Sequence, residues 1–302
     1  MNLHRVVISG NSPGPRLLIF GGVHGDEYEP IAAVFHLASL IERENLRGEV
    51  TLVPIVNEPA FQQHSRTGPD GLDLARTFPG SATGSPTEQI AHAANELIQQ
   101  SDFLIDLHTG GLAMRITPLV GYMLVADEGT LAAQRRMAQA FGMPVVWGSS
   151  ATLEGRSLSA ARDANVPAIY AEWGGGGGCD PRGVADYVQG CLRVMGELDM
   201  LPGTVPVSPV SVNSAPLVVE DRRTESGLLQ IQYPAPHPGF YELTAPLGQE
   251  VSPGDELGRL FRLDGEAPTI IRAVHTGLLI LARALPAVAE GDCLAFVLEA
   301  QE

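Results

Sequence analysis

Short apolar runs of strand length alternate with longer helical patterns over about the first 200 residues, and this alternation constrains the fold more than any other feature of the sequence. Continuous apolar strands between helices are typical of a mostly parallel or mixed sheet that is covered by helices. We therefore expect an α/β fold. The predicted strands are residues 16–21, 49–56, 103–107, 122–126, 144–147 and 168–171, and the predicted helices are 30–44, 86–100, 129–141, 158–164 and 182–198. In the second helix, Ser85, Pro86 and Glu88 have the pattern of a capping box.

The pattern changes after residue 200. Residues 201–216 read LPGTVPVSPVSVNSAP, which predicts an extended linker. Short β-rich pieces follow, among them LLQIQY at 228–233, and they predict a smaller C-terminal β-sandwich or barrel domain. Residues 245–260 and 282–297 share a strand, a V-x-x-GD turn and a second strand, which indicates an internal duplication. We place the domain boundary between residues 203 and 204.

Composition excludes several classes of function. The net charge of −16 disfavours nucleic acid and anionic membranes as partners. All 19 basic residues are arginine, so a Walker lysine, a Schiff-base lysine and lysine-linked lipoyl, biotin or pyridoxal phosphate are excluded. The three cysteines lie far apart and suggest no disulfide framework or cysteine-rich metal site. No secretory leader pattern or apolar run of about 20 residues is present, so we expect a cytoplasmic protein.

The first predicted strand ends in FGGVHGDE, where His24 and Glu27 lie three residues apart. Glycines after a strand allow a tight turn, and residues i and i+3 share a face if a helix begins near residue 24. The predicted strand at 103–107 ends in DLHTGG, which brings His108 to the same edge of the sheet. His, Glu and His also hold catalytic zinc in thermolysin and carboxypeptidase A, where a fourth position is open to water. These three residues are therefore our candidate metal ligands, for one Zn²⁺ per chain.

A third strand reads PAIYAEWGGGGG and is expected to end at Glu172, beside a mobile glycine-rich turn. A carboxylate at that edge suits a general base that acts on water at a metal ion. The loop SRTGPDGLDLARTFPG carries Arg66 and Arg76, whose guanidinium groups suit an oxyanion or a substrate carboxylate. Arg115 is a candidate of the same kind, and Asn57 is a further candidate substrate contact.

Together these segments resemble the succinylglutamate desuccinylase/aspartoacylase family, a branch of the zinc carboxypeptidase-like superfamily. GGVHGDEYEP and DLHTGG resemble its two zinc motifs, YAEWGGGG its catalytic-glutamate segment, and NEPAFQQHSRTGPDGLDLARTFPG its substrate-binding loop. The resemblance implies a zinc-hydrolase domain over residues 1–203 and a β-rich domain over residues 204–302. It implies that His24, Glu27 and His108 bind zinc and that Glu172 is the base. It further implies that Arg66 polarises the scissile carbonyl and that Arg76 contacts a substrate carboxylate.

The sequence departs from the family at one position, because Ala75 stands where the usual D-L-N-R motif has Asn. The loss of that amide removes a hydrogen bond worth roughly 0.5–1.5 kcal/mol and is expected to redirect substrate recognition. The length of the C-terminal region and the HGDEYE opening favour relatives that deacetylate N-acetyl-diaminobutyrate. The leading prediction is a zinc-dependent deacylase of small N-acyl amino acids or related N-acyl amines. A carboxypeptidase-like peptidase and a non-catalytic metal-dependent binding protein are the alternatives, and a homo-oligomer is left open.

Overall fold

The structure, a computed structural model, describes residues 3–201 and 215–299. The predicted alternation of strands and helices is confirmed. The strands of the first region are β1 (Val6–Ser9), β2 (Ser12–Phe20), β3 (Arg47–Val53), β4 (Phe103–His108), β5 (Met114–Met123), β6 (Val145–Ser149) and β7 (Ala168–Gly175). The helices are α1 (Tyr28–Leu40), α2 (Glu58–Gln62), α3 (Pro86–Gln99), α4 (Glu128–Phe141), α5 (Ser157–Asp163) and α6 (Pro181–Glu197), with short 3₁₀ turns η1 (Arg43–Asn45) and η2 (Leu74–Arg76). Within the described ranges, no helix combines the length and apolarity needed to cross a bilayer.

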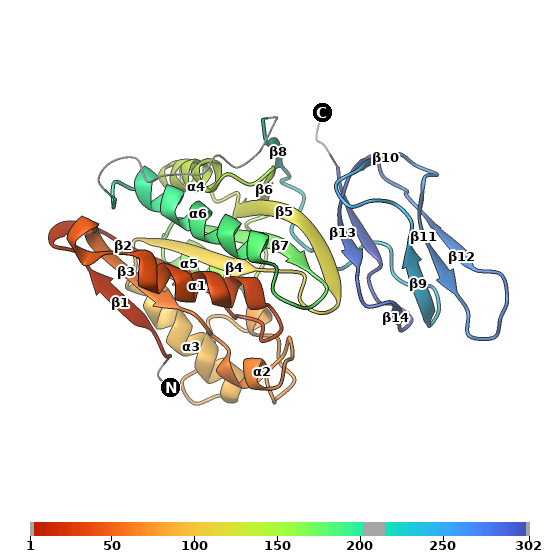
Figure 1. The fold of residues 1–302 in the computed structure, drawn as a ribbon, viewed down its shortest axis with the longest axis horizontal. Coiled ribbons are helices and arrows are strands. Elements are labelled where there is room, and N and C mark those ends of the chain that lie inside the picture. Colours follow the sequence, from red (N-terminus) through yellow and green to blue (C-terminus); the bar gives the residue numbers. More distant parts are fainter. Residues whose placement is uncertain (1–2, 202–214, 300–302) are drawn as a thin grey trace.

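The central sheet is mixed, as predicted. Its strands follow the order β1-β3-β2-β4-β7-β5, and β6 lies beside β5. Strands β2, β3, β4 and β7 are parallel, whereas β5 runs antiparallel to β7. Helices α1, α4 and α6 cover one face of this sheet, and α3 and α5 cover the other (Figure 1). The fold is therefore an α/β sandwich in which strands β2, β4 and β7 are covered on both faces.

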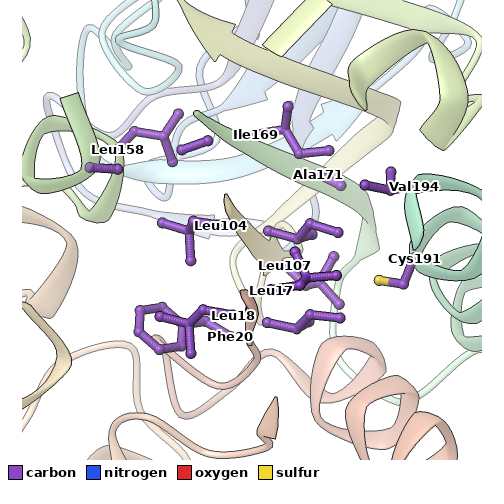
Figure 2. Close-up of a cluster of buried hydrophobic side chains, with 14 of the residues drawn as sticks. Leu17, Leu18, Phe20, Leu104, Leu107, Leu158, Ile169, Ala171, Cys191 and Val194 are labelled. Atoms are coloured by element: carbon purple, nitrogen blue, oxygen red, sulfur yellow. The ribbon is translucent and has the colours of Figure 1, made fainter. Parts of the chain in front are cut away.

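Alternating residues of the central strands point to opposite helix layers, because successive side chains in a strand face opposite sides. Figure 2 shows Leu17, Leu107 and Ala171 on the side of α6, together with its Cys191 and Val194. On the other side, Leu18, Phe20 and Leu104 lie toward Leu158 of α5 (Figure 2). All ten labelled side chains in the figure belong to one buried apolar cluster.

Several predicted boundaries are wrong. The strand predicted at 122–126 is the end of β5, which begins at Met114. Its pairing with β7 shifts register between Ile116 and Leu119, around Pro118, and a proline without an N–H obscures a strand in sequence. Helix α1 ends at Leu40, short of the predicted residue 44. The capping box at Ser85 and Glu88 is confirmed at the start of α3.

The C-terminal region is β-rich, as predicted. Strand β8 (Leu217–Glu220) pairs with β6 and so extends the large sheet. The remaining strands are β9 (Gly239–Leu243), β10 (Glu250–Val251), β11 (Glu256–Phe261), β12 (Thr269–Arg272), β13 (Gly277–Arg283), β14 (Ala287–Val288) and β15 (Ala295–Leu298). Strands β12, β11, β9 and β14 form a second sheet, whereas β13 pairs with β10, β15 and the start of β5. The two regions lie side by side (Figure 1), and backbone pairing between β5 and β13 joins them.

The strand predicted at 228–233 is wrong, because these residues form turns and bends. The predicted domain boundary at 203/204 and most of the predicted linker fall in residues 202–214, outside the described residues. The two segments of the predicted duplication contain equivalent turns. In one, the Asp255 carboxylate accepts a hydrogen bond from the Ser252 N–H. In the other, Asp292 accepts one from the Ala289 N–H in the same way.

Candidate active site

His24 and Glu27 meet across a turn and not along a helix. Strand β2 ends at Phe20, and α1 begins at Tyr28 with Glu27 as its N-cap residue. The expectation that a shared helical face brings the two side chains together is therefore wrong. The turn also requires glycine at position 25, because a Cβ there would lie 2.1 Å from the carbonyl carbon of Ala60. The turn places the His24 Nδ1 atom 2.7 Å from Glu27 Oε1.

His108, the last residue of β4, contacts the other oxygen of the same carboxylate, with 3.2 Å between His108 Nδ1 and Glu27 Oε2. All three side chains are buried, and their ligand atoms lie within 4.8 Å of one another. Two imidazole nitrogens and a carboxylate therefore converge on a single point. This is a donor set that can hold one divalent ion.

The Nε2 atom of each histidine contacts a carboxylate that the sequence analysis did not single out. His24 Nε2 lies 3.1 Å from Asp73 Oδ1, and His108 Nε2 lies 3.1 Å from Asp106 Oδ2. A carboxylate at Nε2 favours the proton on that nitrogen and leaves the Nδ1 lone pair free for a metal. Asp106 could have been found from sequence, since it lies two residues before His108 and thus on the same strand face. No local pattern pointed to Asp73 as a partner of His24.

The electrostatics of the three residues favour an ionised Glu27. Burial alone raises the pKa of this carboxyl, but His24 and His108 outweigh burial and lower the pKa below its usual range. The Thr109 N–H also donates to Glu27 Oε2 at 3.0 Å. Glu27 is therefore a hydrogen-bonded carboxylate that is ready to bind a cation.

Glu172 lies on the neighbouring strand β7, directly opposite His108 in the parallel register. The expected end of the strand at Glu172 is wrong, because β7 continues to Gly175 and its glycines pair with Arg115 and Ile116 of β5. Burial, together with the Glu27 charge, raises the pKa of the partly buried Glu172 carboxyl to about 8. A raised pKa at a cavity wall is typical of an acid–base group.

Of the predicted arginines and Asn57, only some lie near the candidate metal ligands. Arg66 lies close to the three candidate metal ligands, with its Nε bonded to Asp73 Oδ2 at 3.1 Å and its Nη1 3.7 Å from Glu27 Oε1. Arg76 lines the same cavity. Arg115 is exposed and lies outside the lining of that cavity. Asn57 is buried at the start of α2, where its side chain accepts a hydrogen bond from the Ala60 N–H. The structure thus brings Arg66 and Arg76 to the site and leaves Arg115 and Asn57 away from it.

The cavity beside the candidate metal ligands has a volume of about 90 Å³. Its wall contains two groups that the sequence analysis missed. One is Arg156, the N-cap residue of α5, which donates a hydrogen bond to the Gly227 carbonyl at 3.3 Å. The second is a set of residues from the C-terminal region, namely Gly227, Leu229, Gln230 and Leu281. Burial and the nearby Arg76 lower the pKa of Arg156 to about 10. Arg156 had no signal in the sequence, because a lone arginine before a helix is common.

The chain is similar to known proteins over most of its length. Residues 13–198 match the model of the succinylglutamate desuccinylase/aspartoacylase catalytic domain. The chain is 32% identical to the N-alpha-acetyl-L-2,4-diaminobutyric acid deacetylase of Halomonas elongata, over 98% of this chain and 86% of the relative.

Solved structures show the same likeness. The product-bound ectoine utilization protein EutE (DoeB) of Ruegeria pomeroyi is 30% identical with a TM-score of 0.87, over 97% of this chain and 87% of that one. A succinylglutamate desuccinylase from Silicibacter sp. TM1040 is 29% identical with a TM-score of 0.88, over 98% and 88% of the two chains.

Proposed function

The chain belongs to the succinylglutamate desuccinylase/aspartoacylase family, and on that basis we propose that it is a zinc-dependent deacylase that hydrolyses the amide bond of small N-acyl amino acids. Its relatives are named as a deacetylase and a desuccinylase, which are amide-cleaving hydrolases. The protein is thus an enzyme of the amide-hydrolase class.

The convergence of His24, Glu27 and His108 beside Glu172 is the observation that carries the proposal. The two Nδ1 atoms face the two oxygens of Glu27 at 2.7 and 3.2 Å, while the Nε2 atoms are held by Asp73 and Asp106. These donor types and separations fit a tetrahedral zinc site with one position left for another ligand. A bound zinc ion would make water acidic near neutral pH and polarise a carbonyl group.

Glu172 is the proposed general base. In its carboxylate form it accepts a proton from the attacking water, and the water oxygen forms a bond to the amide carbon. Glu172 then returns the proton to the nitrogen as the C–N bond breaks. The products are a carboxylic acid and a free amine. A pKa raised by burial suits this dual role, because the group must both accept and release a proton.

Arg66 is the proposed donor to the oxyanion that develops on the scissile carbonyl. Its guanidinium lies at the cavity wall, and Asp73 fixes its orientation through Nε. Asp73 also contacts His24, so one carboxylate holds both the metal ligand and the oxyanion donor in place. Such preorganised donors stabilise a developing charge more than flexible ones do.

Arg76 and Arg156 are the proposed contacts for the carboxylate of the amino acid. Both line the cavity, and their only side-chain hydrogen bonds within the described residues go to the carbonyls of Ala75 and Gly227. Two guanidinium groups without a carboxylate partner favour an anionic ligand. Ala75 lines the same cavity and offers no side-chain amide there. Gly227, Leu229, Gln230 and Leu281 line part of the cavity, whose volume of about 90 Å³ favours a small substrate over a peptide.

Zinc quantitation followed by a hydrolysis screen tests the proposal. We expect one zinc per chain, loss of activity with a chelator and recovery on adding zinc. The screen compares N-acetyl and N-succinyl amino acids with short peptides that have free C-termini. Hydrolysis without any metal, or faster cleavage of peptides than of N-acyl amino acids, would contradict the proposal.

A further inference from the structure

The cavity is lined by chemically different sets of side chains. One set contains the three candidate metal ligands with Glu172 and Arg66. A second set, which we call the apolar wall, comes from four separate segments, namely β5, the stretch from residue 153 to α5, the turns after β8, and β13. Its members are Ile116, Met123, Leu153, Leu158, Leu229 and Leu281. A substrate whose amide reaches the metal ligands shares the cavity with these apolar side chains.

No carboxylate in the described lining is left over to bind a cation. The lining contains Glu27, Asp106 and Glu172 as its only acidic residues. Glu27 contacts both histidines. Asp106 contacts His108 and accepts a hydrogen bond from the Ser157 hydroxyl. Glu172 is the proposed base beside His108.

The arginines of the lining differ from its carboxylates, because two of the three have only backbone carbonyls as hydrogen-bond partners within the described residues. Arg66 is paired with Asp73, but neither Arg76 nor Arg156 forms an ion pair with an acidic residue in the part of the chain that the structure describes. One substrate carboxylate can offset one of these two charges. The other guanidinium then still lies in the cavity without an acidic partner, and it opposes a cationic group beside it.

We propose that the cavity selects N-acyl amino acids with an apolar side chain and discriminates against a cationic side chain of the same size. This inference rests on the proposed deacylase function and names the side-chain class of its substrate. It also separates this chain from its Halomonas elongata relative, which is named for a substrate with an amino group on the side chain. The proposal rests on the apolar side chains of the lining and on the two arginines without acidic partners.

The test uses two substrates with side chains of equal length. N-acetyl-L-norvaline ends in a methyl group where Nα-acetyl-L-2,4-diaminobutyrate ends in an ammonium group, which is charged at pH 7. We expect kcat/KM of the zinc-loaded protein to be about 100-fold higher for the norvaline derivative, since the cavity offers an ammonium group no uncommitted carboxylate. Inhibition by free norvaline and free diaminobutyrate, the amine products, should show the same order. An equal or higher kcat/KM for the diaminobutyrate derivative would overturn the inference and leave the deacylase function standing.

A negative charge introduced at the apolar wall tests whether electrostatics cause the preference. Leu229 lies in a turn and is partly buried. Leu229→Asp should reduce the preference for norvaline at least tenfold, and Leu229→Asn, the matched neutral variant, should leave most of it. Equal shifts in both variants would overturn the electrostatic explanation. Failure of the wild-type protein to hydrolyse any N-acyl amino acid would instead overturn the proposed function together with this inference.

Discussion

The two faces of strands β4 and β7 differ sharply in chemistry, although their residues alternate along the same short segments of sequence. On the α6 side lie Ile105 and Leu107 of β4 with Ala171 of β7, all fully buried. On the α5 side lie Asp106 and His108, opposite Tyr170 and Glu172 in the register. The face toward α6 is apolar core throughout. The face toward α5 is apolar at the start of the strands and carries the candidate active-site residues toward their carboxyl ends.

This difference shows how one strand can contribute to the apolar core and to the candidate active site at once. The apolar face buries side chains against α6, which stabilises the fold in proportion to the area removed from water. The opposite face buries polar groups, which is costly unless each one has a partner. The partners are present as His108–Asp106 and His24–Asp73. We expect substitutions on the two faces to affect different measurements, and the following predictions test this separation.

The largest effect is expected for Glu172→Gln. The amide cannot accept the proton from water, so kcat should fall about 1,000-fold. Zinc content should match that of the wild-type protein, because Glu172 is not among the candidate metal ligands. Steady-state kinetics and elemental analysis on the same preparation provide the two readouts. Near-normal turnover in this variant would remove Glu172 from the mechanism.

Ile105→Ala should change stability and not chemistry. Ile105 is fully buried on the α6 side of β4, and its truncation should lower the free energy of unfolding by about 2–5 kcal/mol. Denaturant titration measures this loss. The kcat/KM per folded molecule should stay within about threefold of wild type, since the side chain points away from the active site. A large drop in kcat/KM with unchanged stability would mean that the two faces are not separable.

Asp106→Asn tests the adjacent residue on the opposite face. The variant keeps the shape of the side chain but loses the charge that supports His108, so zinc affinity should fall about 10–100-fold. Competition with a chelator measures the affinity. Ile105→Ala, one residue earlier, is the matched control and should bind zinc as the wild type does. Unchanged zinc binding in Asp106→Asn would show that His108 needs no support from Asp106.

The smallest effect is expected for Thr87→Val, at the anchor of the loop that carries Arg66 and Asp73. Asp70 in this loop accepts hydrogen bonds from the Thr87 N–H at 2.9 Å and from its hydroxyl at 2.6 Å. Burial opposes the Asp70 carboxylate, but these hydrogen bonds outweigh burial and lower the pKa of Asp70 to about 2. Removing the hydroxyl should cost about 1 kcal/mol of stability at pH 7.

The effect of pH on this variant follows from the direction of the shift. The folded-state pKa of Asp70 lies below its ordinary value of 3.8, so the stabilisation is complete above about pH 4 and is lost as the pH falls toward 2. The stability difference between wild type and Thr87→Val should therefore be smaller at pH 3 than at pH 7. Thr83→Val, at an exposed threonine of the same loop region, is the control. An equal difference at both pH values would contradict the role of Asp70.

Much of the first region could be predicted from the sequence because its signals are local. Apolar runs and helical periods placed β2, β3, β4, β6 and β7, and a strand that ends in His or contains Glu directed attention to His108 and Glu172. Local errors arose where local signals conflict. Pro118 interrupts β5, and the glycines after Glu172 read as a loop although two of them extend β7.

The sequence by itself determined the α/β architecture, the β-rich C-terminal region and the types of side chain available for chemistry, since periodicity and composition are properties of neighbouring residues. Only the tertiary structure decided the partners of those side chains: Asp73 behind His24, Arg156 and Leu229 at the cavity wall, and β13 against β5. These contacts join residues that are tens to hundreds of positions apart. They depend on strand register and on the way the two regions pack, and no local pattern in a single sequence encodes either one.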